Sequence, residues 1–270
     1  MSTSSTTAGS PHRPPQTHAN QRVLVTAAAS GIGLATAVAF VQAGARVFIC
    51  DVDAGELART LEAQPALSGM VCDVSDEAQV GTLFKHAIAE LGGLDILVNN
   101  AGVAGPTALV EEMAFGDWRR CLAVNLDSVF LCARLAAPHL RQQGSGSIVN
   151  LSSTAGLFGF PRRAPYAAAK WAIRGLTRTL AQELGPHGVR VNCICPGSVS
   201  GERIERVIAA ESAKTGESAQ AVRSRMTDGV SLKTFVAPRD IADTILFLTS
   251  EGGARISGQD ITVDGHTETF

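Results

Sequence analysis

The chain has 270 residues, of which 45% are hydrophobic and 18% charged, and its formal net charge is −2. That much apolar material supports a sizeable core and excludes a disordered chain. The Lys and Arg residues are scattered without a basic run, so the charge pattern does not indicate binding to nucleic acid or to an anionic membrane.

The first 20 residues are rich in Ser, Thr, Pro and His and contain no apolar segment. A secretory signal needs an apolar stretch of about 7–15 residues, so we expect residues 1–20 to be a disordered leader. Later apolar stretches are too short or too interrupted by glycine to span a bilayer. We therefore expect a cytoplasmic protein with no membrane partner.

From residue 22 onward, short β-branched runs alternate with helical segments. The expected strands are Arg22–Thr26, Arg46–Asp51, Gly69–Asp73, Leu94–Asn99, Ser147–Ser152, Val189–Cys195 and Asp260–Val263. The expected helices between them include Ile32–Ala43, Asp76–Leu91, Phe115–Gln142, Tyr166–Leu184 and Pro238–Leu248. Several strands read as continuous apolar runs, which is typical of strands covered on both faces. The alternation predicts one α/β domain over residues 21–270, a doubly wound parallel sheet with helices on both faces.

Residues 197–237 depart from this alternation because they are more polar and carry helical pieces at Glu202–Ala213 and Ala219–Thr227. The segment follows a strand end, where ligands of such sheets bind. We expect a substrate lid, the alternative being an ordinary surface loop.

The first expected strand runs into a glycine-containing turn that opens a helix. The residues of this turn that we expect at the cofactor are Thr26, Ser30, Gly31, Ile32 and Gly33. Glycines there let backbone N–H groups approach a pyrophosphate, which the N-terminus of the helix also attracts. Such a turn is common before a helix, so on its own it is a weak signal.

Asp51 ends the second expected strand, 18 residues after Gly33. A carboxylate at this place can accept hydrogen bonds from the ribose hydroxyls of adenosine and would repel a 2′-phosphate. No Arg or Lys stands at Ser30 or just after Asp51 to bind that phosphate. We therefore expect NAD rather than NADP, the alternative being that Asp51 is a solvated acid at a strand end.

Two further strand ends complete the expected adenosine site. After the third strand come Asp73, which we expect to accept from the adenine amino group, and Val74. After the fourth strand come Asn99, Asn100, Ala101 and Gly102. Small residues and side-chain amides suit a loop that passes under the adenosine, although Asn99 could equally serve by bracing neighbouring strands.

Tyr166 and Lys170 stand four residues apart, which places them on one face of a helix. A tyrosine hydroxyl is a poor base at neutral pH, but a nearby ammonium group favours the phenolate. The phenolate can take a hydroxyl proton as hydride leaves for the cofactor. Ser153 can hold the substrate oxygen, and Asn125, by kinking its helix, could support a water linked to Lys170.

In this order the segments resemble the short-chain dehydrogenase/reductase superfamily over residues 22–270. The motifs that carry the resemblance are Thr26…Gly31-Ile32-Gly33, Asp73, Asn99–Gly102, Asn125, Ser153, Tyr166-x-x-x-Lys170 and Cys195-Pro196-Gly197. The resemblance implies a Rossmann-like fold with a seven-stranded parallel sheet, and a homotetramer. It also implies a catalytic tetrad of Asn125, Ser153, Tyr166 and Lys170, in which Ser153 rather than Ser152 lies 13 residues before Tyr166. The nicotinamide would be flanked by Pro196, Gly197 and Val199.

The chain departs from the family where the usual Thr-Gly reads Thr26-Ala27. If position 27 needs a positive φ, alanine destabilises it by about 1 kcal/mol, whereas a negative φ costs little. We therefore expect lower cofactor affinity but unchanged cofactor use. A second departure is Ser200, where many relatives have a threonine that holds the carboxamide; the hydroxyl is retained.

Arg162 and Arg163 lie between Ser153 and Tyr166, and Arg203 lies in the expected lid. A guanidinium suits the recognition of carboxylates. The hypothesis is a hydride transfer between NAD and a secondary alcohol or ketone, the substrate being an anionic hydroxy or sugar acid. The arginines could instead serve in surface salt bridges or subunit contacts.

Two other functions stay open on the same fold. One is a catalytically silent NAD-binding sensor or scaffold, and the other is a non-redox epimerase or dehydratase. The six cysteines and six histidines show no metal-ligand spacing, so we expect buried, reduced thiols and no metal site.

Overall fold

The structure is a computed structural model that describes residues 17–267, apart from the side chains of Arg203, Ala210 and Lys214. Seven parallel strands form one sheet in the order β3-β2-β1-β4-β5-β6-β7. The strands are β1 Arg22–Thr26, β2 Arg46–Asp51, β3 Leu67–Val71, β4 Ile96–Asn99, β5 Gly146–Leu151, β6 Val189–Pro196 and β7 Asp260–Val263. This confirms the predicted seven-stranded, Rossmann-like sheet in a single domain.

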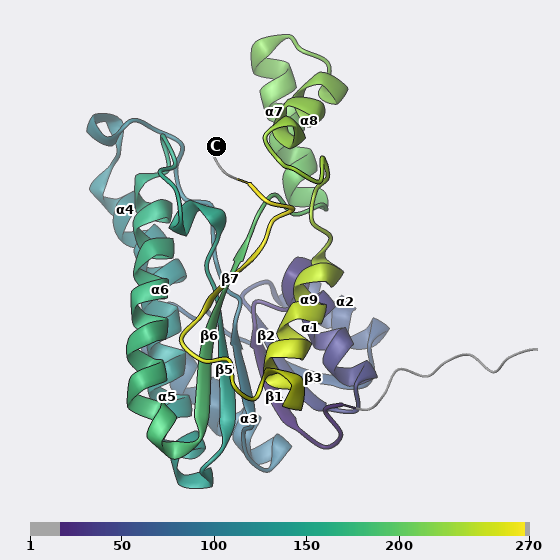
Figure 1. The fold of residues 1–270 in the computed structure, drawn as a ribbon, viewed down its shortest axis with the longest axis vertical. Coiled ribbons are helices and arrows are strands. Elements are labelled where there is room, and N and C mark those ends of the chain that lie inside the picture. The colour runs from purple at the N-terminus through teal and green to yellow at the C-terminus, as the bar shows by residue number, and fades with distance from the viewer. Residues whose placement is uncertain (1–16, 268–270) are drawn as a thin grey trace, which may run out of the picture.

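Helices cover both faces of the sheet. Their bounds are α1 Gly31–Gln42, α2 Ala54–Ala63, α3 Glu77–Leu91, α4 Phe115–Leu122, α5 Ser128–Gln143, α6 Ala164–Leu184, α7 Glu202–Thr215, α8 Ala219–Asp228 and α9 Pro238–Thr249. In Figure 1, α4, α5 and α6 lie on one side of the sheet and α1, α2 and α9 on the other, while α7 and α8 project beyond its edge.

The central strand β1 shows why the apolar runs are continuous. Leu24 faces the core under α3 and α5, whereas Val23 and Val25 face the core under α1 and α9, and all three are fully buried. Because side chains alternate between the two faces, a strand covered on both sides buries every residue.

The predicted single helix over Phe115–Gln142 contains a break in its hydrogen-bond pattern. A π-helical turn at Ala123–Asp127 joins α4 to α5. This run, Phe115–Gln143, is the one helix within residues 17–267 that is long and apolar enough, by length and composition alone, to cross a membrane. Its α5 part packs against α3, β4 and β5, so the core accounts for its apolar character.

The described chain begins inside the region expected to be a leader. Thr17–Asn20 form a turn, and His18 is only 1% exposed, with its ring edge on Phe40 and its Nε2 2.9 Å from Thr249 Oγ1. The predicted boundary at residue 20 is therefore wrong for these four residues, because His18 packs between α1 and α9. Residues 1–16 lie outside the described part of the chain.

Burial lowers the pKa of His18 below its usual value. The unfolded chain then binds more protons than the folded one, so folding stability should fall as pH drops through about 6.5 towards the folded-state pKa. We expect the melting temperature of the wild type to fall more steeply between pH 7 and 5 than that of His18→Gln. Parallel melting curves check this, and equal slopes would show that His18 does not contribute.

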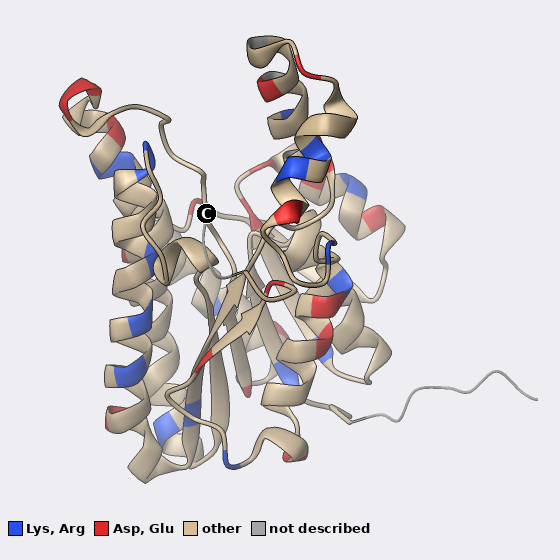
Figure 2. Ribbon diagram, turned by 45° about the horizontal axis from the view of Figure 1, so that its top comes forward, with Lys and Arg blue, Asp and Glu red and all other residues tan. Residues whose placement is uncertain are grey.

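The expected lid, residues 197–237, leaves the sheet at the end of β6 and returns at α9. Its two ends pair through a bridge between Val199 and Val236. Ion pairs that join α8 to α7 or to the turn between the two helices hold the projecting part together; they are Arg223–Glu205, Arg225–Glu211 and Arg225–Glu217. Figure 2 shows these helices carrying both acidic and basic positions.

All six cysteines are buried and unpaired, as expected. Burial raises the pKa of Cys132 to about 12, so this thiol stays protonated at neutral pH. Among residues 17–267, no group of three or more His, Cys, Asp or Glu side chains could hold a metal ion.

Candidate active site

The turn between β1 and α1 presents backbone to open space. Gly31 has φ +56, and a Cβ placed on it would have no atom within 4 Å. Gly33 is the opposite case, since its Cβ would lie 2.5 Å from the Ala27 carbonyl oxygen. Ser30 is exposed at the N-cap, while Ile32 packs partly on the core. The open N-terminus of α1 fits a pyrophosphate, as its N–H groups and dipole favour an anion there.

Ala27 has φ +50, so the condition for backbone strain is met. We expect Ala27→Gly to raise the free energy of unfolding by about 1 kcal/mol and to tighten NAD binding, because the relaxed turn holds the phosphate-binding backbone. Chemical denaturation and calorimetric titration with NAD measure the two effects. Ala29→Gly, in the same turn without a positive φ, is the matched control and should only destabilise. An unchanged NAD dissociation constant in Ala27→Gly would contradict the effect on binding.

The carboxylate of Asp51 is fixed beside this turn. Its Oδ2 accepts from the Ala29 N–H at 3.1 Å, and its Oδ1 accepts from the Asp53 N–H at 3.1 Å. Each oxygen keeps a lone pair for a further donor. The acid expected to select the cofactor is therefore held at the carboxyl end of β2, next to the open turn.

The loop after β4 is tied to the end of β1. Thr26 Oγ1 accepts from the N–H groups of Asn100 and Ala101 at 3.0 and 3.2 Å, and Asn100 Nδ2 donates back to the Thr26 and Ala27 carbonyls. Asn99 Nδ2 donates to Asn150 Oδ1 at 2.8 Å, which supports a bracing role for Asn99. Thr26 and Asn100 therefore fix the backbone of the turn through these hydrogen bonds.

Asp73 does not close the third strand, because β3 ends at Val71. Its Oδ1 instead accepts from the backbone N–H and the hydroxyl of Ser75, at 2.9 and 2.7 Å. Val74, next in the chain, is buried. The strand prediction was two residues late because the run continues apolar through Cys72, which is buried outside the ladder.

Two side chains of the predicted tetrad, those of Asn125 and Lys170, meet at Gly102. A Cβ on Gly102 would lie 2.8 Å from Asn125 Oδ1 and 3.4 Å from Lys170 Nζ. Asn125 sits in the π turn, and its Nδ2 donates to the Cys121 and Val103 carbonyls at 2.9 and 3.0 Å. Its Oδ1 is buried without a hydrogen-bond partner among the described residues. The amide is therefore oriented with its acceptor towards Lys170.

Lys170 is 3% exposed and donates from Nζ to the Leu151 carbonyl at 2.8 Å. Its ammonium lies 5.6 Å from the centroid of the Tyr166 ring, as the spacing of four residues on α6 predicts. Tyr166 is half-buried, and its ring meets the Phe160 ring edge-on at a centroid distance of 6.5 Å. Sequence reasoning missed Phe160, which belongs to no motif.

The two neighbouring serines differ in their contacts. Ser152 is buried and donates to the Lys170 carbonyl at 2.7 Å. Ser153 is half-buried and accepts from the Ala155 N–H at 3.1 Å, so its own hydroxyl hydrogen can turn towards a substrate. These contacts support Ser153 as the serine that faces the substrate.

The predicted nicotinamide side lies at the end of β6. Pro196 closes the strand, and a Cβ on Gly197 would lie 2.8 Å from Asp264 Cβ, which explains a glycine there. Val199 pairs with Val236, and Ser200 Oγ donates to the Val236 carbonyl at 3.2 Å. The Ser200 hydroxyl is therefore engaged by the chain itself.

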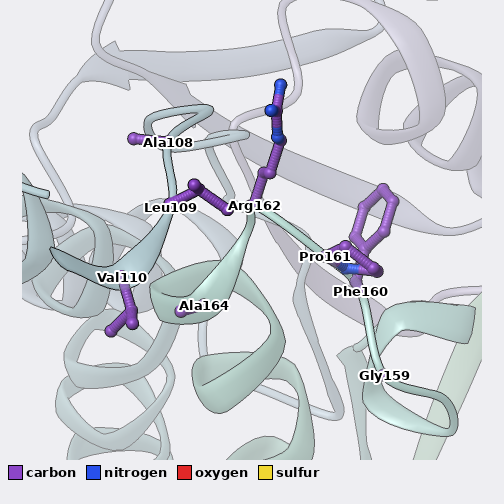
Figure 3. Close-up of a pocket in the computed structure, with 8 residues that line it drawn as sticks. All are labelled: Ala108, Leu109, Val110, Gly159, Phe160, Pro161, Arg162 and Ala164. Atoms are coloured by element: carbon purple, nitrogen blue, oxygen red, sulfur yellow. The ribbon is translucent and has the colours of Figure 1, made fainter. Parts of the chain in front are cut away.

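The predicted substrate arginines do not share one environment. Arg163 donates from Nη1 to the Ala104 and Gly105 carbonyls, both at 3.1 Å, which favours a bracing role. Arg162 is exposed and lines a pocket of about 370 Å³ that Figure 3 shows. Arg203 lies in α7, and its side chain is outside the described part of the structure.

Known proteins share this fold and this site region. A family model described as enoyl-(acyl carrier protein) reductase matches residues 26–266. D-threitol dehydrogenase of Mycolicibacterium smegmatis is 38% identical over 247 residues, covering 90% of each protein.

Two solved structures are similar over nearly the whole chain. NAD+-bound xylitol dehydrogenase superposes with a TM-score of 0.87 at 28% identity, covering 92% of this chain and 99% of that one. Actinorhodin polyketide ketoreductase with NADPH superposes with a TM-score of 0.86 at 32% identity, covering 91% and 96%. The sheet, the site and these likenesses agree, and the chain belongs to the short-chain dehydrogenase/reductase superfamily.

Proposed function

We propose that the chain is an NAD-dependent oxidoreductase that interconverts a secondary alcohol and its ketone, the substrate being an anionic hydroxy or sugar acid. The observation that supports it most is the buried Lys170 ammonium, which lies 5.6 Å from the Tyr166 ring and beside Asn125 Oδ1. An ammonium at that place favours the phenolate form of a tyrosine.

Bound NAD would supply the hydride acceptor, taking the hydrogen from the carbinol carbon. Ser153 donates a hydrogen bond to the substrate oxygen and holds it towards Tyr166. The Tyr166 phenolate takes the hydroxyl proton, so that the alcohol loses one proton and one hydride and leaves as the ketone. Lys170 stabilises the phenolate, and Asn125 Oδ1 accepts from a water that relays the proton onward. Reduction runs the same steps backwards.

Asp51 supports NAD over NADP, because a fixed carboxylate beside the open turn accepts from ribose hydroxyls and repels a 2′-phosphate. The relatives do not decide this point, as one solved neighbour carries NAD+ and another NADPH. We also propose a homotetramer in the cytoplasm, with residues 197–237 as a lid over the substrate.

The test is a panel of secondary alcohols with NAD, followed by absorbance of the reduced cofactor. Turnover with NAD that exceeds turnover with NADP supports the proposal. NAD binding without turnover of any alcohol or ketone would favour a sensor or scaffold. Conversion of a substrate without net cofactor reduction would favour an epimerase or dehydratase.

A further inference from the structure

One pocket next to Tyr166 is apolar except for a single charged side chain. Of the eight residues that line it, only Arg162 is charged or polar, and the others include Leu109, Val110, Phe160 and Pro161. Figure 3 shows Arg162 and the Phe160 ring rising on the same side of the pocket. With a volume of about 370 Å³, it can hold a chain of several carbons.

The Arg162 guanidinium makes no ion pair or hydrogen bond within residues 17–267. Glu111 and Glu112 follow the pocket residues Leu109 and Val110 in the chain but do not line the pocket, and Glu112 Oε2 accepts from the Leu109 N–H at 3.2 Å. An unpaired guanidinium in an apolar wall is suited to bind an anionic ligand group through its planar fork.

The backbone holds Arg162 in a strained conformation. Its φ is +64, a backbone angle that residues other than glycine rarely adopt. Its carbonyl accepts from the Ala108 N–H at 3.1 Å. The next residue, Arg163, ties the same loop to the Ala104 and Gly105 carbonyls. Both walls of the pocket are thus joined before a ligand arrives, and strain of this kind is often retained at functional sites.

We propose that this pocket selects substrates that carry a carboxylate at the far end of an apolar chain, and that Arg162 binds this carboxylate. The proposal rests on the function proposed above and narrows it from hydroxy and sugar acids in general. Phe160 contacts Tyr166 and also lines the pocket, so the pocket adjoins the reacting centre through this ring. Tyr166 itself does not line the pocket, and we infer that a carboxylate bonded directly to the reacting carbon does not reach Arg162.

A matched set of ketones built on six-carbon acids tests each part of the proposal. The set holds 5-oxohexanoate, its neutral methyl ester, 2-oxohexanoate with the carboxylate next to the ketone, and 5-ketogluconate, whose chain carbons carry hydroxyl groups. We expect kcat/KM for reduction to be about tenfold higher for 5-oxohexanoate than for each of the other three.

Variants at position 162 assign the effect to the guanidinium. Arg162→Met should remove the preference for 5-oxohexanoate over its ester, and Arg162→Lys should retain part of it. Arg162→Gly relieves the positive φ, so it should lose the preference while melting at a higher temperature. Arg141→Met, on the exposed end of α5, is the control and should leave the preference unchanged.

The outcomes separate this proposal from the function it rests on. An unchanged preference in Arg162→Met, or a 5-ketogluconate rate that equals that of 5-oxohexanoate, would overturn it even if ketones are turned over. If no ketone is turned over, calorimetric titration with 5-oxohexanoate decides it. Binding that weakens about tenfold in Arg162→Met supports the carboxylate site, and binding that is absent or unchanged in the variant rejects it.

Discussion

Tyr166→Phe should lower kcat by a factor of about 10²–10⁴, the range associated with loss of a general acid–base group. The substitution removes one oxygen atom, and the edge-on contact with Phe160 and the position over Lys170 do not depend on that oxygen. NAD affinity should therefore change little. Steady-state kinetics on the best alcohol of the panel and calorimetry with NAD measure both quantities.

A control for this variant lies on the same helix. Trp171 is 49% exposed and stacks on Arg174, so Trp171→Phe changes an aromatic side chain of α6 without touching the site. It should retain normal turnover. Residual activity in Tyr166→Phe within tenfold of the wild type would mean that another group takes the proton.

Asp51→Asn should shift the ratio of kcat/KM for NAD to that for NADP by about 10–100-fold in favour of NADP, because hydrogen bonds to a charged group contribute about 1.5–3 kcal/mol. The amide still offers an oxygen to the Ala29 N–H, so the turn is kept. Removing the negative charge weakens acceptance from the ribose hydroxyls and ends the repulsion of a 2′-phosphate.

Kinetics with both cofactors at a fixed concentration of alcohol measure this ratio. Asp53→Asn is the matched control, since Asp53 caps α2 through the Glu56 N–H rather than facing the turn. A ratio that is the same in the wild type and in Asp51→Asn would show that the carboxylate does not select the cofactor.

The sheet could be predicted from sequence because burial on both faces leaves a strong local signal. All seven strands were placed within two residues at both ends, since β-branched runs and turn residues mark them. The third strand was shifted because a buried thiol, Cys72, continues the apolar run past the ladder. His18 was missed because a polar sequence gives no sign of a partner more than 200 residues away.

The site likewise combines features that are local in the sequence with features that depend on the packing of distant segments. Spacing along one helix is local, so the placement of Lys170 over the Tyr166 ring could be read from sequence. The φ of Ala27 and the bonds of Arg163 to the Ala104 and Gly105 carbonyls depend on how distant segments pack. From the sequence we could set out what a positive φ at Ala27 or a bracing role of Arg163 would imply, but not whether either holds.

The π turn at Ala123–Asp127 makes helix length part of the site. Such a turn holds one residue more than an α-helical turn, so it is equivalent to a single-residue insertion. Deleting one residue there would restore regular α-helical hydrogen bonding and rotate Asn125 by about 100° relative to Lys170. Selection for a more stable helix and selection for the Asn125 acceptor therefore act in opposite directions on the same few codons.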